Sequence, residues 1–132
     1  MRLVTGGTGL VGSFVEADYK ISSKDVDLRN FDKTLELFKK LNPKEVIHCA
    51  AKVGGVGGNM NHKGEFFYDN IMINTNILEI CRLVDVEKVV SFLSTCIFPN
   101  KIEYPLTITN SIVEHLLKDV KKKEYLSLSM YT

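Results

Sequence analysis

The first dozen residues, MRLVTGGTGLVG, constrain the fold of this chain more than any other stretch. Residues Arg2 to Thr5 predict a short buried strand. Glycines follow this strand at Gly6, Gly7, Gly9 and Gly12. Glycine lets the backbone turn tightly, approach a pyrophosphate closely and pack the next helix against the sheet. We therefore expect a phosphate-binding turn, with a helix that begins near Gly9 or Leu10 and points its first amides at the phosphates.

The glycine spacing fits two dinucleotide-binding patterns. Gly7, Gly9 and Gly12 give G-x-G-x-x-G. With Thr5 in front, the glycines from Gly6 onward give T-G-x-x-G-x-x-G, the form found in the short-chain dehydrogenase/reductase superfamily. The residues of this turn that we expect to contact a cofactor are Gly6, Gly9, Leu10, Val11 and Gly12.

Length and composition limit the classes of protein to consider. The 132 residues have room for one domain, and not for a dinucleotide-binding domain plus a full substrate domain. Lys and Arg number 17 against 16 Asp and Glu, and this balance predicts neither a nucleic-acid nor a membrane partner. No signal-peptide pattern and no long apolar run is present, so we expect a soluble, cytoplasmic protein. The cysteines and histidines are scattered, which predicts reduced thiols and no metal site.

The second predicted strand, Tyr19 to Ile21, leaves only about ten residues for the first crossover. Either its helix is unusually short, or residues of the native protein are missing from this stretch. Ser22, Ser23 and Lys24 follow, where an acidic residue would bind the ribose hydroxyls of NAD. Two hydroxyls and an ammonium group suit a 2′-phosphate and predict NADP. The alternative is a polar loop in which Lys24 is solvated beside Asp25.

Two stretches show the apolar spacing of a helix. The first is Phe31 to Leu41, with Asn30 as its N-cap and Asn42 at its end, and we interpret its apolar stripe as core. The second is Phe66 to Val84. It contains three asparagines, Asn70, Asn74 and Asn76. Asparagine is a poor helix former, so we expect these amides either to face the cofactor or a neighbouring backbone, or to be exposed.

A third buried strand is predicted over residues 45–51. It ends in Ala50 and Ala51, whose small side chains would let a ligand approach the backbone. The glycines between residues 54 and 58 predict a mobile loop at the same edge of the sheet, where open α/β folds bind ligands. A simple surface loop is the alternative.

The fourth predicted strand, Lys88 to Leu93, runs into Ser94, Thr95 and Cys96. Hydroxyl and thiol groups then lie at the edge where catalysis is expected in this architecture. A hydroxyl can hydrogen-bond a substrate carbonyl, and a thiolate can act as a base on an acidic carbon. Taken alone, a buried cysteine is more often inert core.

Five segments, spread over residues 4 to 99, carry a family resemblance. They are VTGGTGLVG, SSKDVDL, VIHCAAKVGG, DNIMINTNIL and SFLSTCIFP. Together they resemble the GDP-L-fucose synthases, which are GDP-4-keto-6-deoxymannose epimerase/reductases of the extended short-chain dehydrogenase/reductase family. The resemblance covers Met1 to about Pro105, and its most specific element is the run from Ser94 to Pro99.

The resemblance implies an activity and a set of residues. Members of that family epimerise a 4-keto sugar at two carbons and then reduce the ketone with NADPH. By motif, Ser94 is similar to the hydroxyl that holds the keto oxygen, Cys96 to the acid or base of epimerisation, and Thr95 to a residue of the same pocket. The positions matched to the cofactor site are Gly6, Gly9, Leu10, Val11, Gly12, Ser23, Lys24, Asp27, Leu28, Ala50 and Ala51.

The family pattern breaks in the last part of the chain. No tyrosine has a lysine four positions later, so the family's Tyr-x-x-x-Lys pair is absent, as are its later histidine acid and its nucleotide-sugar region. Residues 106–132 no longer match. A helix from Asn110 or Ser111 and a strand over Tyr125 to Met130 are predicted there, and they could belong to a later part of the same enzyme.

We therefore predict an incomplete α/β fold, a Rossmann-type doubly wound parallel sheet whose first four strands have the order 3-2-1-4. Residues 1–105 form the NADP-binding domain, 106–132 a helix-strand segment, and the substrate domain is not present. The expected function is NADPH-dependent conversion of GDP-4-keto-6-deoxy-D-mannose to GDP-L-fucose by a homodimer, with these residues by themselves inactive. The alternatives are a non-catalytic NADP-binding module and a reductase or epimerase of another nucleotide sugar, which Cys96 disfavours.

Overall fold

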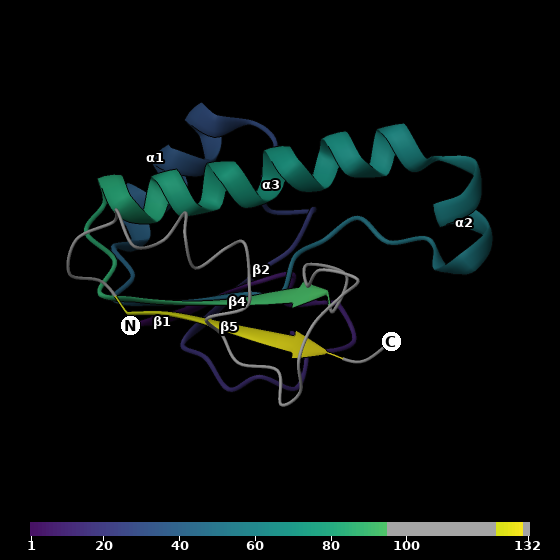
Figure 1. The fold of residues 1–132 in the computed structure, drawn as a ribbon. Helices are drawn as coiled ribbons and strands as arrows, with labels where there is room; N and C mark the ends of the chain where they lie inside the picture. The colour runs from purple at the N-terminus through teal and green to yellow at the C-terminus, as the bar shows by residue number, and fades with distance from the viewer. Residues whose placement is uncertain (95–123, 131–132) are drawn as a thin grey trace.

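The computed structural model describes residues 1–94 and 124–130, and these residues form one parallel sheet with the strand order β2-β1-β3-β4-β5 (Figure 1). The strands are β1 (Arg2–Thr5), β2 (Tyr19–Ile21), β3 (Glu45–His48), β4 (Lys88–Ser94) and β5 (Glu124–Met130). The helices are α1 (Phe31–Leu41), α2 (Gly55–Asn61) and α3 (Lys63–Leu83). The predicted Rossmann-type α/β fold is confirmed, as is the strand expected near Tyr125. The helix expected from Asn110 lies outside the described residues.

The predicted strand order is wrong at one point. The order 3-2-1-4 would place β3 beside β2, whereas β3 pairs in parallel with β1 along its whole length. The reason lies in β2, where Tyr19 and Lys20 are exposed and only Ile21 is buried. A central strand of a parallel sheet is apolar over most of its length. Strand β2 therefore lies at the edge, and α1 carries the chain back past β1 to β3.

The first crossover contains turns in place of the predicted helix. The Gly9 amide donates to the Gly6 carbonyl at 2.9 Å, and the Ser13 amide donates to the Gly9 carbonyl at 3.0 Å, but no regular helix follows. By Asp18 the chain has already returned to the start of β1, where the Asp18 amide donates to the Arg2 carbonyl at 3.1 Å. The few residues in between must span the length of β1, which leaves none for a packed helix.

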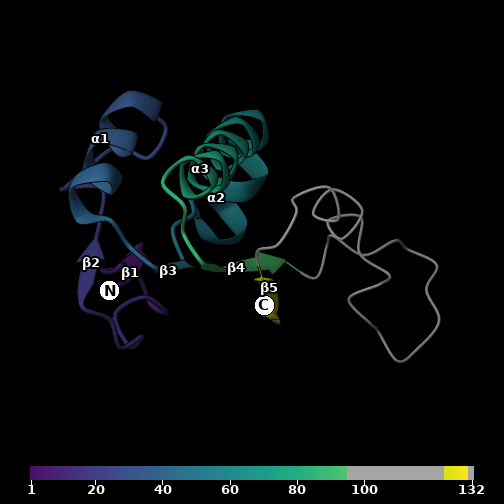
Figure 2. The ribbon, with the colours of Figure 1, turned by 90° about the vertical axis from the view of Figure 1, so that its left-hand side faces the viewer.

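The core lies between the sheet and helices α1 and α3, which cover the same face of the sheet (Figure 2). Its buried members are Leu3, Ile21, Val26, Leu28, Phe38, Val46, Ile77, Ile80, Cys81, Val86 and Val89. Helix α1 forms as predicted, because the Asn30 side chain caps it by accepting from the Lys33 amide at 3.1 Å. It ends at Asn42, which adopts the left-handed conformation with φ 46°.

The glycine segment predicted as a mobile loop instead forms helix α2. Within this helix, the Gly58 amide donates to the Gly54 carbonyl at 3.2 Å. A Cβ on Gly54 would lie 2.8 Å from the Phe66 ring, so glycine permits α2 to fold back closely on α3. Packing against Phe66 thus orders a stretch whose composition alone indicates a loop.

Candidate functional site

A cleft of about 490 Å³ lies at the carboxyl ends of β1, β2 and β3. In the observed strand order, β2 lies on one side of β1 and β3 lies on the other. The direction in which successive strands are added to the sheet therefore reverses between β1 and β3. Open α/β sheets bind ligands in the crevice outside such a reversal. Residues that line the cleft are Gly6, Thr8, Gly9, Ile21, Ser22, Ser23, Val26, Asp27, Leu28, Arg29, Cys49, Ala50, Ala51, Lys52, Asp69 and Ile73.

The glycine turn forms one wall of this cleft. Gly6 has a φ of 70°, and a Cβ there would lie 2.8 Å from the Cα of Ala50. A Cβ on Gly12 would collide with the Gly6 carbonyl oxygen. Both positions therefore require glycine, one because of backbone conformation and close approach, the other because of close approach alone. The result is a bare backbone surface at the end of β1, suited to a ligand that must come close.

The loop after β2 is folded by its own side chains. The backbone amide and the hydroxyl of Ser22 both donate to Asp25 Oδ2 at 2.8 Å, and these hydrogen bonds hold the pKa of the Asp25 carboxyl below its usual range. Ser23 lines the cleft, while Lys24 lines an adjoining hollow that Ser23 shares. The Asp25 carboxylate is engaged with Ser22 and lines the adjoining hollow together with Ser23 and Lys24.

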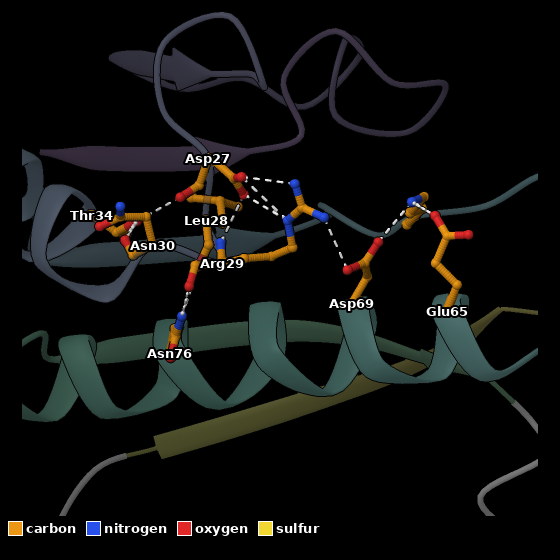
Figure 3. A network of polar contacts seen from close by, with 9 residues as sticks. Asp27, Leu28, Arg29, Asn30, Thr34, Glu65, Asp69 and Asn76 are labelled. Carbon is orange, nitrogen blue, oxygen red and sulfur yellow. Dashed lines mark hydrogen bonds and ion pairs between the residues drawn. The ribbon is translucent and has the colours of Figure 1, made fainter.

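Charged side chains form a chain of ion pairs along the cleft wall that faces α3 (Figure 3). Arg29 pairs with Asp27, with Nη2 to Oδ2 at 2.8 Å, and with Asp69, with Nη1 to Oδ1 at 3.0 Å. Lys52 Nζ contacts Asp69 Oδ2 at 2.7 Å and also pairs with Glu65. Lys52 and Arg29 hold the pKa of the Asp69 carboxyl below its usual range, and Asp69 and Glu65 raise the pKa of Lys52.

The hydrogen bonds of its three asparagine side chains explain why α3 tolerates these poor helix formers. Asn76 Nδ2 donates to the carbonyls of Leu28 and Arg29 at 3.0 Å each (Figure 3). Asn70 exchanges hydrogen bonds with the Lys52 backbone, accepting at 2.7 Å and donating at 2.9 Å. The expectation that these amides face a neighbouring backbone is confirmed for both. Asn74 donates to the Asn70 carbonyl and contacts a ring described next.

His48 is a buried imidazole held between β1 and α3. Its Nδ1 lies 2.6 Å from Thr5 Oγ1, and its Nε2 lies 3.0 Å from Asn74 Oδ1. Because an amide oxygen only accepts, Nε2 carries the proton, and Nδ1 accepts from the Thr5 hydroxyl. Burial lowers the pKa of His48 to about 4, so the ring is neutral at pH 7. The ring is therefore a structural link beneath the glycine turn and carries no positive charge for a ligand.

The structure brings together most of the predicted cofactor residues. Those that line the cleft are Gly6, Gly9, Ser23, Asp27, Leu28, Ala50 and Ala51. Leu10, Val11 and Gly12 lie in the turn outside that lining. Ser94 ends β4, while Thr95 and Cys96 lie outside the described residues.

Sequence reasoning did not identify Arg29, Lys52 and Asp69 as cleft residues. Their partners are distant in the chain, since Asp69 is 40 positions from Arg29 and 17 from Lys52. No spacing rule links them. A weak signal was Asp69 directly before Asn70, an acidic and an amide side chain between the apolar Phe67 and Ile71.

In the part of the chain that the structure describes, no cluster of His, Cys, Asp and Glu could hold a metal ion. No described helix has both the length and the apolar character needed to cross a membrane.

Comparisons with known proteins agree with this geometry. The model of the NAD dependent epimerase/dehydratase family matches residues 2–116. GDP-L-fucose synthase of Dictyostelium discoideum and the probable GDP-L-fucose synthase of Drosophila melanogaster are each 47% identical over 118 residues, covering 81% of this chain. The crystal structure of a GDP-L-fucose synthetase from Naegleria fowleri bound to NADP has a TM-score of 0.73 at 37% identity, over 97% of this chain and 51% of that one. This chain spans 37% of the length of the two sequence relatives.

The neutral state of His48 predicts a specific pH dependence of stability. The unfolded ring takes up a proton near pH 6.5, whereas the folded ring does so only near pH 4. As the pH falls from 6.5 to 4, the free energy of unfolding should therefore fall by about 3 kcal/mol on account of this residue. Urea unfolding at several pH values measures it. The His48→Gln variant should lose this part of the slope and the exposed control His62→Gln should keep it; an unchanged slope in His48→Gln would contradict the assignment.

Proposed function

Because the chain belongs to the NAD-dependent epimerase/dehydratase family, we propose that it binds NADPH in the cleft between β1 and β3, as part of an enzyme that epimerises and reduces GDP-4-keto-6-deoxy-D-mannose to GDP-L-fucose. The observation that supports this most directly is the glycine turn at the point where the strand order reverses. The similarity to GDP-L-fucose synthases supports the choice of reaction.

The residues present fit a dinucleotide phosphate. Gly6, Gly9 and Gly12, with Leu10 and Val11 between them, would hold the pyrophosphate, because side chains at the glycines would fill the turn. Ser23 and Lys24 would hold the 2′-phosphate at the end of β2. The adenosine part would lie against four residues, Asp27, Leu28, Ala50 and Ala51. When bound, NADPH supplies the hydride for ketone reduction.

The catalytic residues that we propose follow β4. Abstracting a proton beside a ketone leaves an enolate, and a hydroxyl donor at the keto oxygen stabilises the charge that develops there. We assign this donor to Ser94 and the proton transfer to Cys96, with Thr95 beside them. Strand β4 ends at Ser94 on the carboxyl edge of the sheet, which is the edge that carries the cleft.

We also propose that the protein is a homodimer that pairs through α3. Three large apolar side chains on its first half are exposed, with Phe67 at 70%, Tyr68 at 62% and Ile71 at 50%. A helix that exposes such a patch is typical of an interaction surface. A second copy of the same helix would cover it symmetrically.

NADPH titration followed by cofactor fluorescence tests the proposed site. The protein should bind NADPH more tightly than NADH, and Gly12→Ala should weaken NADPH binding by at least about tenfold because its Cβ meets the Gly6 carbonyl oxygen. Gly64→Ala is the matched control, since a Cβ on Gly64 meets open space. Absent NADPH binding, or equal loss in both variants, would refute the site. Equal affinity for NADH and NADPH would refute the 2′-phosphate assignment.

Separate assays of the two half-reactions test the role of Cys96. In protein that turns over the nucleotide sugar, Cys96→Ser should slow exchange of the sugar's acidic protons with deuterated solvent by at least about tenfold, because it removes the acid-base group. Ketone reduction in the same variant should fall less and serves as the internal reference. An undiminished exchange rate would remove Cys96 from the mechanism, and binding of NADPH without turnover by the unsubstituted protein would favour a non-catalytic module.

Light scattering tests the dimer. Ile71→Asp should convert it to a monomer, because a carboxylate in the centre of an apolar interface is desolvated without a partner. Lys33→Asp, an exposed change in the first turn of α1, should leave the mass unchanged. A monomeric unsubstituted protein would contradict the proposal.

A further inference from the structure

Asp69 is a buried carboxylate held between two cations that come from different loops. Its side chain is 4% exposed, while those of Arg29 and Lys52 are 45% and 37% exposed. Arg29 belongs to the loop after β2, and Lys52 belongs to the loop after β3. Both loops line the cleft, one on each side of it. Asp69 thus joins two segments that are separate in the sequence and contribute different walls.

Helix α3 is the element that holds both walls. Asn76 hydrogen-bonds the backbone of the first loop, at the carbonyls of Leu28 and Arg29. Asn70 hydrogen-bonds the backbone of the second loop, at Lys52. Each asparagine contacts one loop. Asp69 forms ion pairs with both loops, with Arg29 of the first (Figure 3) and with Lys52 of the second.

The charges of this wall indicate a positioning role and argue against a phosphate site. Arg29 already pairs with Asp27 and Asp69, and Lys52 already pairs with Glu65 and Asp69. Three carboxylates thus face two cations, which leaves a net charge of −1. A phosphate would be repelled, and each cation is already hydrogen-bonded to carboxylates. What these ion pairs supply is a fixed separation of the two loops.

We propose that Asp69 is a positioning residue for the dinucleotide site, one that sets the width of the cleft by binding Arg29 and Lys52 at the same time. The proposal rests on the NADPH site proposed above. A cleft whose walls are already held at the right separation binds its ligand more tightly, since less ordering is required on binding. Asp69 therefore acts on the cofactor through Arg29 and Lys52, by fixing where their two loops lie.

Amide hydrogen exchange of the unliganded protein tests the joining of the loops. Asp69→Asn should speed exchange by at least about tenfold in both residues 27–30 and residues 51–53. Arg29→Gln should speed exchange in the first loop only, and Lys52→Met in the second only. All three variants should fold, because in Asp69→Asn each cation keeps its second carboxylate and the other two side chains are partly exposed. Unchanged exchange in either loop of Asp69→Asn would overturn the proposal.

NADPH titration of the same variants tests the effect on the cofactor. Asp69→Asn should raise the dissociation constant by about tenfold. In the Arg29→Gln background, the further effect of Asp69→Asn should be at least about threefold smaller, because a residue that acts through Arg29 is not additive with it. Additive effects would overturn the proposal and indicate a general loss of stability.

Glu79→Gln is the matched control. It removes the same charge from the same helix, where Glu79 pairs with Arg82 of α3 itself. It should change neither the exchange of the two loops nor the NADPH affinity. A protein that does not bind NADPH at all would refute the proposed function, whereas the exchange of the two loops would still decide whether Asp69 joins them.

Discussion

The cleft depends on the close approach of two backbones, those of Gly6 and Ala50. Strands β1 and β3 pair up to Thr5 and His48, and the Cys49 amide still donates to the Thr5 carbonyl at 3.1 Å. Beyond that point Gly6 turns away with a φ of 70°, at a distance where no Cβ would fit. The segments that follow β1 and β3 therefore separate directly after their last hydrogen bonds. The cleft opens between them, where the strand order reverses. A Cβ at Gly6 would lie 2.8 Å from the Cα of Ala50, so any side chain there would force the two backbones apart.

Helix α3 holds the loops around the cleft in place, through an unusual distribution of its side chains. Over its first half, polar residues such as Asp69 and Asn70 face the protein, while the apolar Phe67 and Ile71 face outward. Over its second half, apolar residues pack in the core. Because α3 runs antiparallel to the strands, its first half lies over their carboxyl ends (Figure 1). The polar side chains of α3 thus form hydrogen bonds and ion pairs with the loops around the cleft, and its apolar half anchors the helix to the sheet.

The sequence predicted the elements better than their arrangement. The Asn30 cap and the spacing to Leu41 are local signals, so α1 could be placed closely. The strand order depends on which strand can lie at the edge of the sheet. The polar character of Tyr19 and Lys20 indicates an edge strand, but the sequence prediction placed β2 in the interior of the sheet. The ion pairs of Asp69 could not be predicted, because they follow from the packing of α3 across the sheet and from no spacing along the chain.

The unequal lengths of the strands determine the shape of the carboxyl edge of the sheet beside the cleft. His48 is level with Ser91 in the ladder, and β3 ends there. Strand β4 continues to Ser94, three residues and about 10 Å farther along the strand direction. The edge of the sheet is therefore stepped, with β4 rising beside the point where the chain after β3 turns into Ala50 and Ala51. The backbone at the end of β4 is two strand spacings, about 10 Å, from the line of β1. A molecule at this step would have the end of β4 on one side and the cleft on the other, and holding two groups side by side in this way favours a reaction between them.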